Sequence, residues 1–300
     1  MSTTPSILVG IDYSPSCKNA LREAARLSNA SKSPLVCYHV LDEEILSDFK
    51  KLDSYDEAGI VDFARTKMET FIQEIIGAAQ EIHTVISVGH PFKETLKLIE
   101  EHHAEILVLG SRGLGSSEAS LVGRLASRCL RRAPVEVLLV RKNQDHPFTV
   151  ITACIDFSEN SIRAARRAAE IAKQDSASLN LIHVHRPVAY FDAGAGIPVS
   201  TVPILEEASI VENLEDRLAT IGYELGKEFD LQNISTTVLI SARVSYEIET
   251  HLKAINADLI VLGTRGRTGF KRLLLGTTAE SIIHHTSCSA LAVKPEDFHL

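Results

Sequence analysis

A glycine-rich segment near the C-terminus has the residue types and spacing of a phosphate-binding turn. Gly263 and Gly266 follow a short apolar run, and Gly276 comes ten residues later with Thr277 and Thr278 behind it. Glycines at the exit of a strand let the main chain turn tightly and approach a ligand, because no Cβ stands in the way. A glycine followed by hydroxyls at a helix start offers main-chain N–H groups, a positive dipole end and side-chain donors. The segment therefore predicts an anion cradle suited to a phosphate.

Further polar residues are expected at the same edge as this segment. Asp156 ends the apolar run Ile151–Ile155, Arg265 stands between the first two glycines, and Arg267–Arg272 adds three cations. Ligands of open α/β sheets bind beyond the carboxyl ends of the strands, where the strand order reverses. We therefore expect Asp156, the strand end at Val184 and the glycine segment to face one site, with the cations near the phosphates.

The same set of residues occurs twice in the chain. Ile7–Ser14 returns as Ile151–Ser158 at an offset of 144 residues, and Gly110–Gly113 returns as Gly263–Gly266 at an offset of 153. The second copy has therefore gained nine residues, which we place in the Pro- and Gly-bearing stretch Arg186–Pro203. A repeat of this length predicts a duplicated domain.

Each copy alternates short apolar runs, typical of buried strands, with amphipathic helical patterns. The expected strands are Ile7–Ile11, Leu35–Val40, Thr84–Val88, Ile106–Leu109 and Val135–Val140, and then Thr149–Ile155, Leu179–Val184, Thr236–Ile240, Leu259–Leu262 and Ala290–Val293. Helices are expected between them, the longest over residues 58–80 and 204–228.

The connections between these strands are long enough to join parallel neighbours, and right-handed crossovers put helices on both faces of a sheet. The predicted fold class is therefore α/β, with two tandem, doubly wound, five-stranded, Rossmann-like parallel-sheet domains. We place them at residues 1–143 and 147–300, joined by a polar segment near Lys142–Pro147.

Composition and charge limit the classes of function that the protein can have. The 300 residues are 45% hydrophobic and 23% charged, which is ordinary for a globular protein, and the length suits two domains. A net charge of −8 disfavours a broad nucleic-acid surface. No apolar stretch approaches the roughly 20 residues that cross a bilayer, and the N-terminus lacks the features of a signal peptide. Five cysteines without a C-x-x-C are expected to be small buried residues. We expect a cytoplasmic protein with no nucleic-acid or membrane partner.

The glycine spacing resembles the nucleotide-binding signature of the universal stress protein (UspA-like) family. That signature is G-x2-G-x9-G-[S/T], and Gly263, Gly266, Gly276 and Thr277 match it. With an aspartate ending the first strand of each copy, the resemblance covers the whole chain as two tandem domains, a UspE-type arrangement. It implies binding of ATP, or of ADP or AMP, and leaves open whether Mg²⁺ or Mn²⁺ accompanies the nucleotide.

The resemblance also implies roles for residues of the second copy. Asp156 and the main chain at Val184 would bind the adenine or ribose end. The strand exit around Arg265 would pass beneath the ribose and phosphates, and the helix start at Gly276 would hold the phosphates. The implied nucleotide-binding residues are Asp156, Val184, Leu262, Gly263, Arg265, Gly266, Gly276, Thr277 and Thr278.

The first copy keeps the glycine spacing but loses the hydroxyls. Arg124 stands where the second copy has Thr277, and Leu125 and Ala126 follow it. Glu118 replaces a lysine in the loop, which opposes phosphate binding, although the guanidinium of Arg124 could compensate. We expect a weaker second site, or one adapted to another small ligand. Its residues are Asp12, Val40, Gly110, Arg112, Gly113, Gly123 and Arg124.

Structural roles compete with these assignments. Asp12 and Asp156 could cap the helices that follow them, and packing is the favoured role for His39 and His183. The histidine pairs at 102–103 and 284–285 suit helix ends, where cations complement the dipole. The motifs G-x4-G-K-[S/T], G-x-S-x-G and H-E-x-x-H are absent from the sequence, and no carboxylate pair at helical spacing points to a general acid and base.

These observations favour a stress-response sensor or regulatory module that binds an adenine nucleotide, chiefly in the second domain. One alternative is a slow Mg²⁺- or Mn²⁺-dependent ATP hydrolase or phosphotransferase, and another is a carrier of a small ligand in the first domain. The family resemblance also implies pairing through the last strands. Glu136–Arg141 and Ala290–Lys294 would then join the copies as an intramolecular pseudo-dimer, and a homodimer is left open.

Overall fold

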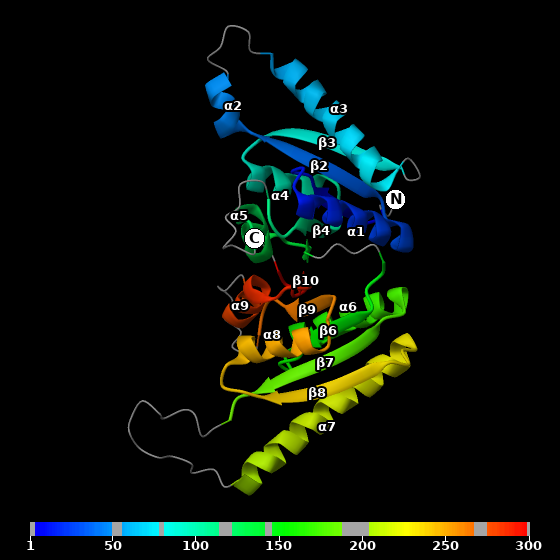
Figure 1. Cartoon of the computed structure of the whole chain (residues 1–300), viewed down its shortest axis with the longest axis vertical. Helices are drawn as coiled ribbons and strands as arrows, with labels where there is room; N and C mark the ends of the chain where they lie inside the picture. Colours follow the sequence, from blue (N-terminus) through cyan, green and yellow to red (C-terminus); the bar gives the residue numbers. More distant parts are fainter. Residues whose placement is uncertain are drawn as a thin grey trace, which may run out of the picture. The chain divides into compact units, whose positions relative to one another are not determined.

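The computed structural model of the chain describes residues 4–49, 56–77, 81–113, 122–141, 146–187, 204–266 and 275–298. The chain divides into two compact units, one of residues 1–145 with 298–300 and the other of residues 146–297. Each unit is a parallel sheet with helices packed on its faces (Figure 1), so the predicted fold class is confirmed. The predicted joint and the predicted nine-residue insertion fall mostly on residues 142–145 and 188–203, outside the described residues.

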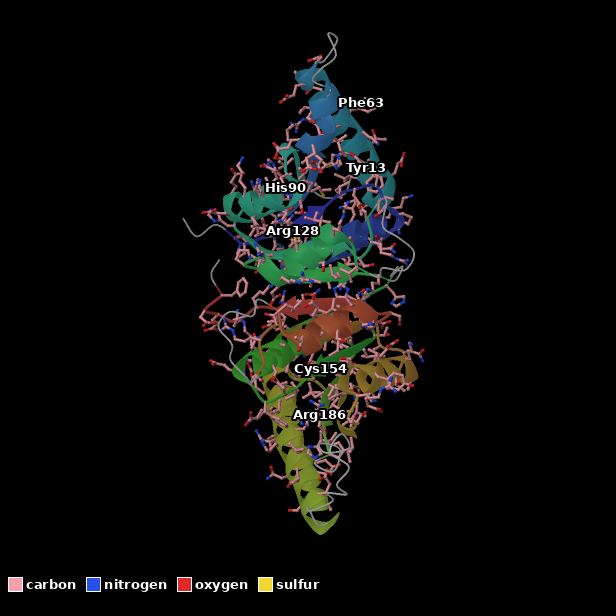
Figure 2. All side chains as sticks on the ribbon, turned by 90° about the vertical axis from the view of Figure 1, so that its left-hand side faces the viewer. Tyr13, Phe63, His90, Arg128, Cys154 and Arg186 are labelled. Carbon is pink, nitrogen blue, oxygen red and sulfur yellow. The ribbon has the colours of Figure 1, made fainter. Side chains whose placement is uncertain are left out.

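The sheet of the first unit has the order β3-β2-β1-β4-β5. Its strands are β1 Ser6–Gly10, β2 Leu35–Asp42, β3 Ile82–Gly89, β4 Ala104–Gly110 and β5 Glu136–Val140. Its helices are α1 Pro15–Ser31, α2 Glu43–Phe49, α3 Glu57–Ile76, α4 Pro91–Glu101 and α5 Arg124–Arg132. Helices α1 and α3 contact each other, and so do α4 and α5. At the second of these contacts His90 and Arg128 lie next to each other (Figure 2).

The sheet of the second unit repeats this order as β8-β7-β6-β9-β10. Its strands are β6 Val150–Cys154, β7 Ser178–His185, β8 Ile234–Ile240, β9 Leu259–Gly263 and β10 Ser289–Val293. Its helices are α6 Glu159–Asp175, α7 Ile204–Phe229, α8 Val244–Ala254 and α9 Thr277–His285. The strand order reverses between β6 and β9, as it does between β1 and β4, and a ligand is expected at such a point.

Burial explains why the strands were readable from the sequence. Every residue of β10 is buried, and so are the first four residues of β9, as is typical of strands in a parallel sheet. Helix α2 was not predicted. It is only seven residues long, too short to show a helical period, although Asp42 Oδ1 accepts a hydrogen bond from the Glu44 N–H at 3.0 Å. No described helix is both long and apolar enough to cross a membrane.

Serines, not aspartates, cap the first helix of each unit. The Oγ atoms of Ser14 and Ser158 accept hydrogen bonds from N–H groups in the first turns of α1 and α6, at 3.2 and 3.3 Å. Oδ1 of Asp12 accepts from the Ser14 N–H at 3.0 Å, and Oδ1 of Asp156 accepts from the Ser158 N–H at 2.9 Å. The aspartates therefore fix the turn that precedes the cap, which corrects the alternative in which they cap the helices themselves.

Ser158→Ala is expected to lower the free energy of unfolding of the second unit by about 1 kcal/mol, because it removes the cap of α6. Ser158→Thr keeps an acceptor and should recover most of that loss. Urea unfolding followed by circular dichroism measures both variants against the parent chain. Equal losses in the alanine and threonine variants would show that the hydroxyl does not act as the cap.

Candidate functional site

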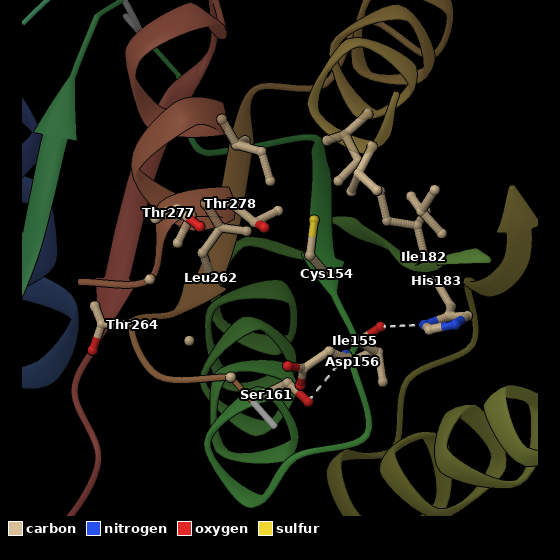
Figure 3. A pocket seen from close by; sticks show the side chains of 18 of the residues that line it. Cys154, Ile155, Asp156, Ser161, Ile182, His183, Leu262, Thr264, Thr277 and Thr278 are labelled. Carbon is tan, nitrogen blue, oxygen red and sulfur yellow. Dashed lines mark hydrogen bonds between the residues drawn. The ribbon is translucent and has the colours of Figure 1, made fainter. Parts of the chain in front are cut away.

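A cavity of about 490 Å³ lies at the carboxyl edge of the second sheet, beside the reversal between β6 and β9. The ends of β6, β7 and β9 and the first turns of α8 and α9 enclose it (Figure 3). All the residues assigned to the second-copy site from the sequence line this cavity: Asp156, Val184, Leu262, Gly263, Arg265, Gly266, Gly276, Thr277 and Thr278. The structure thus brings together residues from separate segments of the chain, with Asp156 and Leu262 more than 100 residues apart.

The first turn of α9 supplies the polar end of the cavity. Gly276 is the N-cap residue and provides no side-chain cap. Its own N–H donates to the Thr264 carbonyl at 2.8 Å, so it is not the bare donor that the sequence suggested. The N–H groups of Thr277, Thr278 and Ala279 have no acceptor among the described residues, as expected for the first turn of an uncapped helix. These three donors and two threonine hydroxyls suit an anion.

The turn after β9 passes close to the start of the second unit. A methyl group on Gly263 would lie 2.9 Å from the main-chain oxygen of Asn160, and one on Gly266 would lie 2.8 Å from Oδ2 of Asp156. Glycine is therefore required by close approach of the backbone at Gly263, whereas at Gly266 only a side-chain oxygen would have to move. The Asn160 carboxamide contacts the main chain of this turn at Arg265, which ties the turn to α6.

Asp156 joins the two segments. Its Oδ1 accepts from both the N–H and the hydroxyl of Ser158, while its Oδ2 points toward the turn at Gly266. The carboxylate thus holds the loop between β6 and α6 and lines the cavity at the same time (Figure 3). A carboxylate in this position can accept hydrogen bonds from sugar hydroxyls.

Arg265 contributes its main chain rather than its charge. Its Nη1 lies 2.7 and 2.9 Å from the two carboxylate oxygens of Asp297, which hold the guanidinium in an ion pair. The turn that Arg265 belongs to lines the cavity, as expected of the segment that would pass beneath the ribose and phosphates. The cationic loop 267–272 lies outside the described residues.

The other end of the cavity is apolar and was only partly anticipated. Side chains from β6, β7, α8 and α9 form it: Cys154, Ile155, Ile182, Val244, Ile248 and Ile282. The sequence marks them as apolar but carries no signal for which apolar residues face a cavity rather than the core. A wall of this kind suits the flat face of a base.

Cys154 differs from the other cysteines. It is partly exposed and its sulfur faces the cavity (Figure 3), whereas the other four cysteines are buried. Although the residue as a whole is only partly buried, its thiol is shielded from solvent, and this burial raises the thiol pKa, so the thiol is neutral at physiological pH.

A histidine, an aromatic ring and a cation pack together behind the aspartate in each unit. The His183 Nδ1–H donates to the Ile155 carbonyl at 2.7 Å, its ring lies 4.8 Å from that of Phe157, and the Arg217 guanidinium lies 4.0 Å from the Phe157 ring. Phe157 has a positive φ of 62°. The predicted packing role of His183 fits this arrangement, which fixes the strained residue next to Asp156.

The first unit builds the same stack from Tyr13, His39 and Lys67. The His39 Nδ1–H donates to the Ile11 carbonyl at 2.7 Å, and the Tyr13 ring lies 5.2 Å from the imidazole and 4.3 Å from the Lys67 nitrogen. Burial is the main cause of the lowered pKa of His39, and the charge of Lys67 adds to it. His39 is therefore neutral at pH 7, in agreement with a packing role.

The weaker site predicted in the first unit has a matching frame. Its residues lie at or just after the C-terminal ends of β1, β2 and β4 and at the start of α5: Asp12, Val40, Gly110, Arg112, Gly113, Gly123 and Arg124. The Gly123 N–H donates to the Ser111 carbonyl at 2.7 Å, and Gly123 also lacks a side-chain cap. The two units therefore differ in the side chains that follow, Arg124 against Thr277. Glu118 lies outside the described residues.

The described residues contain no group of three or more His, Cys, Asp or Glu side chains placed to hold a metal ion.

Comparisons with known proteins agree across both units. The model of the universal stress protein family matches residues 4–141 and again residues 147–294. A universal stress protein of Mycolicibacterium smegmatis is 25% identical over 307 residues, which is 98% of each chain. Universal stress protein A homolog 1 of Coxiella burnetii is 32% identical over 145 residues, 48% of this chain and 94% of its own. The crystal structure of a universal stress protein from Archaeoglobus fulgidus superposes with a TM-score of 0.66 at 18% identity, covering 98% of this chain and 99% of the other.

Proposed function

The chain belongs to the universal stress protein family, with one family domain in each half, and from this we propose that it is a stress-response protein that binds an adenine nucleotide in its second domain. One observation carries the proposal. The cavity of the second unit has main-chain N–H donors and threonine hydroxyls at one end and an apolar wall at the other. A nucleotide has the same division, with phosphates at one end and a base at the other.

The orientation of the nucleotide follows from this polarity. The phosphates would meet the first turn of α9 at Thr277 and Thr278, where the helix dipole favours negative charge. The base would lie against the apolar wall near Val184 and Leu262, and the ribose would reach Asp156. The cavity volume of about 490 Å³ is in the ordinary range for a small-molecule site.

Binding, rather than turnover, is the proposed activity. The carboxylate that lines the cavity, Asp156, is engaged through Oδ1 in holding its own loop. A divalent ion would enter bound to the phosphates. The hydroxyls of the two threonines at the helix start line the cavity, where they could contact such an ion. Hydrolysis or phosphoryl transfer is the competing activity, and carriage of a small ligand by the first domain is a third.

The cytoplasmic location and the pairing of the two domains through Glu136–Arg141 and Ala290–Lys294 also remain predictions. Strands β5 and β10 are the last strands of their units. Within its own unit β5 pairs in parallel with β4, and β10 pairs in parallel with β9. Sedimentation of the whole chain separates a monomer that holds both domains from a homodimer.

Calorimetric titration of the whole chain with ATP is expected to show one dominant site per chain. The second unit has an apolar wall and two threonine hydroxyls at an uncapped helix start, whereas the equally uncapped helix start of the first unit carries Arg124 and Leu125 in place of the threonines. Phosphate release with Mg²⁺ or Mn²⁺ is measured on the same sample. Two sites of equal affinity would contradict the assignment to the second domain, and steady release at rates above the background would favour the enzyme.

A further inference from the structure

Tyr38, on β2 of the first unit, stands at a position that lines the proposed nucleotide cavity in the second unit. Tyr38 is among the largest fully buried side chains of the described chain. It lies opposite Gly10 in the register of β1 and β2, just as Ile182 lies opposite Cys154 in the register of β6 and β7. Cys154 and Ile182 both line the cavity. A tyrosine and a glycine therefore replace two cavity-lining residues in the first unit.

The phenol of Tyr38 covers the end of β1. A methyl group on Gly10 would lie 3.1 Å from the Tyr38 hydroxyl oxygen, 3.3 Å from its Cζ atom and 2.7 Å from Cδ2 of Leu109. A side chain at position 10 and the phenol would thus compete for the same space. In the second unit Cys154 extends from the corresponding position, and its sulfur faces the cavity (Figure 3). The ring therefore lies where the second unit has the apolar end of its cavity.

The hydroxyl group of Tyr38 is held by helix α4. Its oxygen lies 2.9 Å from Oγ1 of Thr95, and the Thr95 hydroxyl donates to the Pro91 carbonyl at 2.8 Å. Because the single proton of Thr95 is used in this way, Tyr38 is the donor of their shared hydrogen bond. Burial is the main cause of the raised pKa of Tyr38, and the neighbouring Cys129 thiol adds to it. The phenol therefore stays protonated and keeps the hydrogen bond that fixes the ring.

The residues around the phenol tip are smaller than their counterparts in the second unit. At the repeat offset of 153 residues, Thr95 corresponds to Ile248 and Cys129 corresponds to Ile282. Both isoleucines line the cavity of the second unit. Threonine and cysteine have shorter side chains than isoleucine, and this leaves room for the tip of the ring beside α4 and α5. The first unit thus changes these cavity-lining positions together, in the way that a buried tyrosine requires.

We propose that the Tyr38 ring occupies, in the first unit, the place that the base takes in the second unit, and that it restricts adenine-nucleotide binding to the second domain. The inference rests on the proposed function and names the residue that decides which domain binds. It assigns the difference to the base end of the site, whereas the sequence pointed to Arg124 at the phosphate end. A tyrosine suits this place because its ring fills an apolar pocket while its hydroxyl finds a polar partner at the edge.

The first test opens the first domain of the whole chain. A double variant, Arg124→Thr with Leu125→Thr, gives the start of α5 the hydroxyls of the second unit. An opened variant adds Tyr38→Ile to these two changes, and a matched control adds Tyr38→Phe, which keeps the ring. Calorimetric titration with ATP counts the sites in each. A second ATP site is expected in the opened variant alone, because the ring still fills the base end in the other two.

The reverse test closes the second domain. The closed variant combines Cys154→Gly, Ile248→Thr and Ile282→Cys with Ile182→Tyr, so that it receives the ring together with the surroundings the ring needs. Its control carries the first three changes without the tyrosine. The closed variant should bind ATP about 100-fold or more weakly than its control, because the ring takes the volume of the base. Thermal unfolding of every variant without nucleotide shows whether the fold is kept.

The outcomes separate this inference from the proposed function. A second site in the double variant, with the ring in place, would overturn the inference, and so would an opened variant that folds but gains no site. A closed variant that binds ATP as tightly as its control would also overturn it, and this comparison decides alone if the opened variant does not fold. In all these cases the parent binds ATP and the proposed function stands. If the parent binds no ATP, the proposed function fails and the inference fails with it.

Discussion

Asp156→Ala is expected to weaken ATP binding by about 100-fold, because two effects act together. The variant removes the acceptor for the ribose and also the Oδ1 that accepts from the N–H and hydroxyl of Ser158. The loop that forms one wall of the cavity then loses its fixed shape. Asp12→Ala makes the same change in the first unit, where Oδ1 accepts from the Ser14 N–H at 3.0 Å, and should leave ATP binding of the whole chain within about twofold.

Competition of a fluorescent ATP analogue with unlabelled ATP measures both variants. Asp156→Asn separates the two effects, since its side-chain oxygen still accepts from Ser158 but carries no charge. It should therefore bind ATP better than Asp156→Ala and worse than the parent. A larger loss in Asp12→Ala than in Asp156→Ala would place the main nucleotide site in the first domain.

The fold could be predicted from the sequence because burial on both faces leaves a strong local signal. Strands such as β9 and β10 are short apolar runs, and the repeat of Ile7–Ser14 as Ile151–Ser158 shows that the pattern occurs twice. Element ends differ by a few residues because caps decide them. For example, Gly276 is the N-cap of α9, and this helix therefore starts at Thr277.

The sequence also predicted which residues would lie together, but it did not predict their hydrogen bonds. The glycine spacing identified the turn after β9, and all the assigned residues line one cavity. Two hydrogen-bond partners could not be read from the sequence: the Gly276 N–H donates to the Thr264 carbonyl, and the Arg265 guanidinium pairs with Asp297. Both partners are set by tertiary packing, and no spacing rule in the sequence reports which acceptor a given donor will meet.

Gly276→Val is expected to weaken ATP binding by about 10- to 100-fold without unfolding the domain, because a side chain would enter the phosphate end of the cavity. Gly276 has φ −63° and ψ 140°, a conformation open to any residue. A Cβ there would meet the Thr264 carbonyl oxygen at an ordinary 3.5 Å. Gly276→Ala should show a smaller loss of the same kind.

Gly263→Ala is the contrasting variant, because its methyl group would lie 2.9 Å from the main-chain oxygen of Asn160. That clash should lower the free energy of unfolding by about 1–3 kcal/mol, whereas Gly276→Val should leave it nearly unchanged. Urea unfolding and ATP titration on both variants distinguish a glycine required by the fold from one required by the ligand. If Gly276→Val unfolds the domain as readily as Gly263→Ala does, or binds ATP as tightly as the parent, the phosphate does not lie at the start of α9.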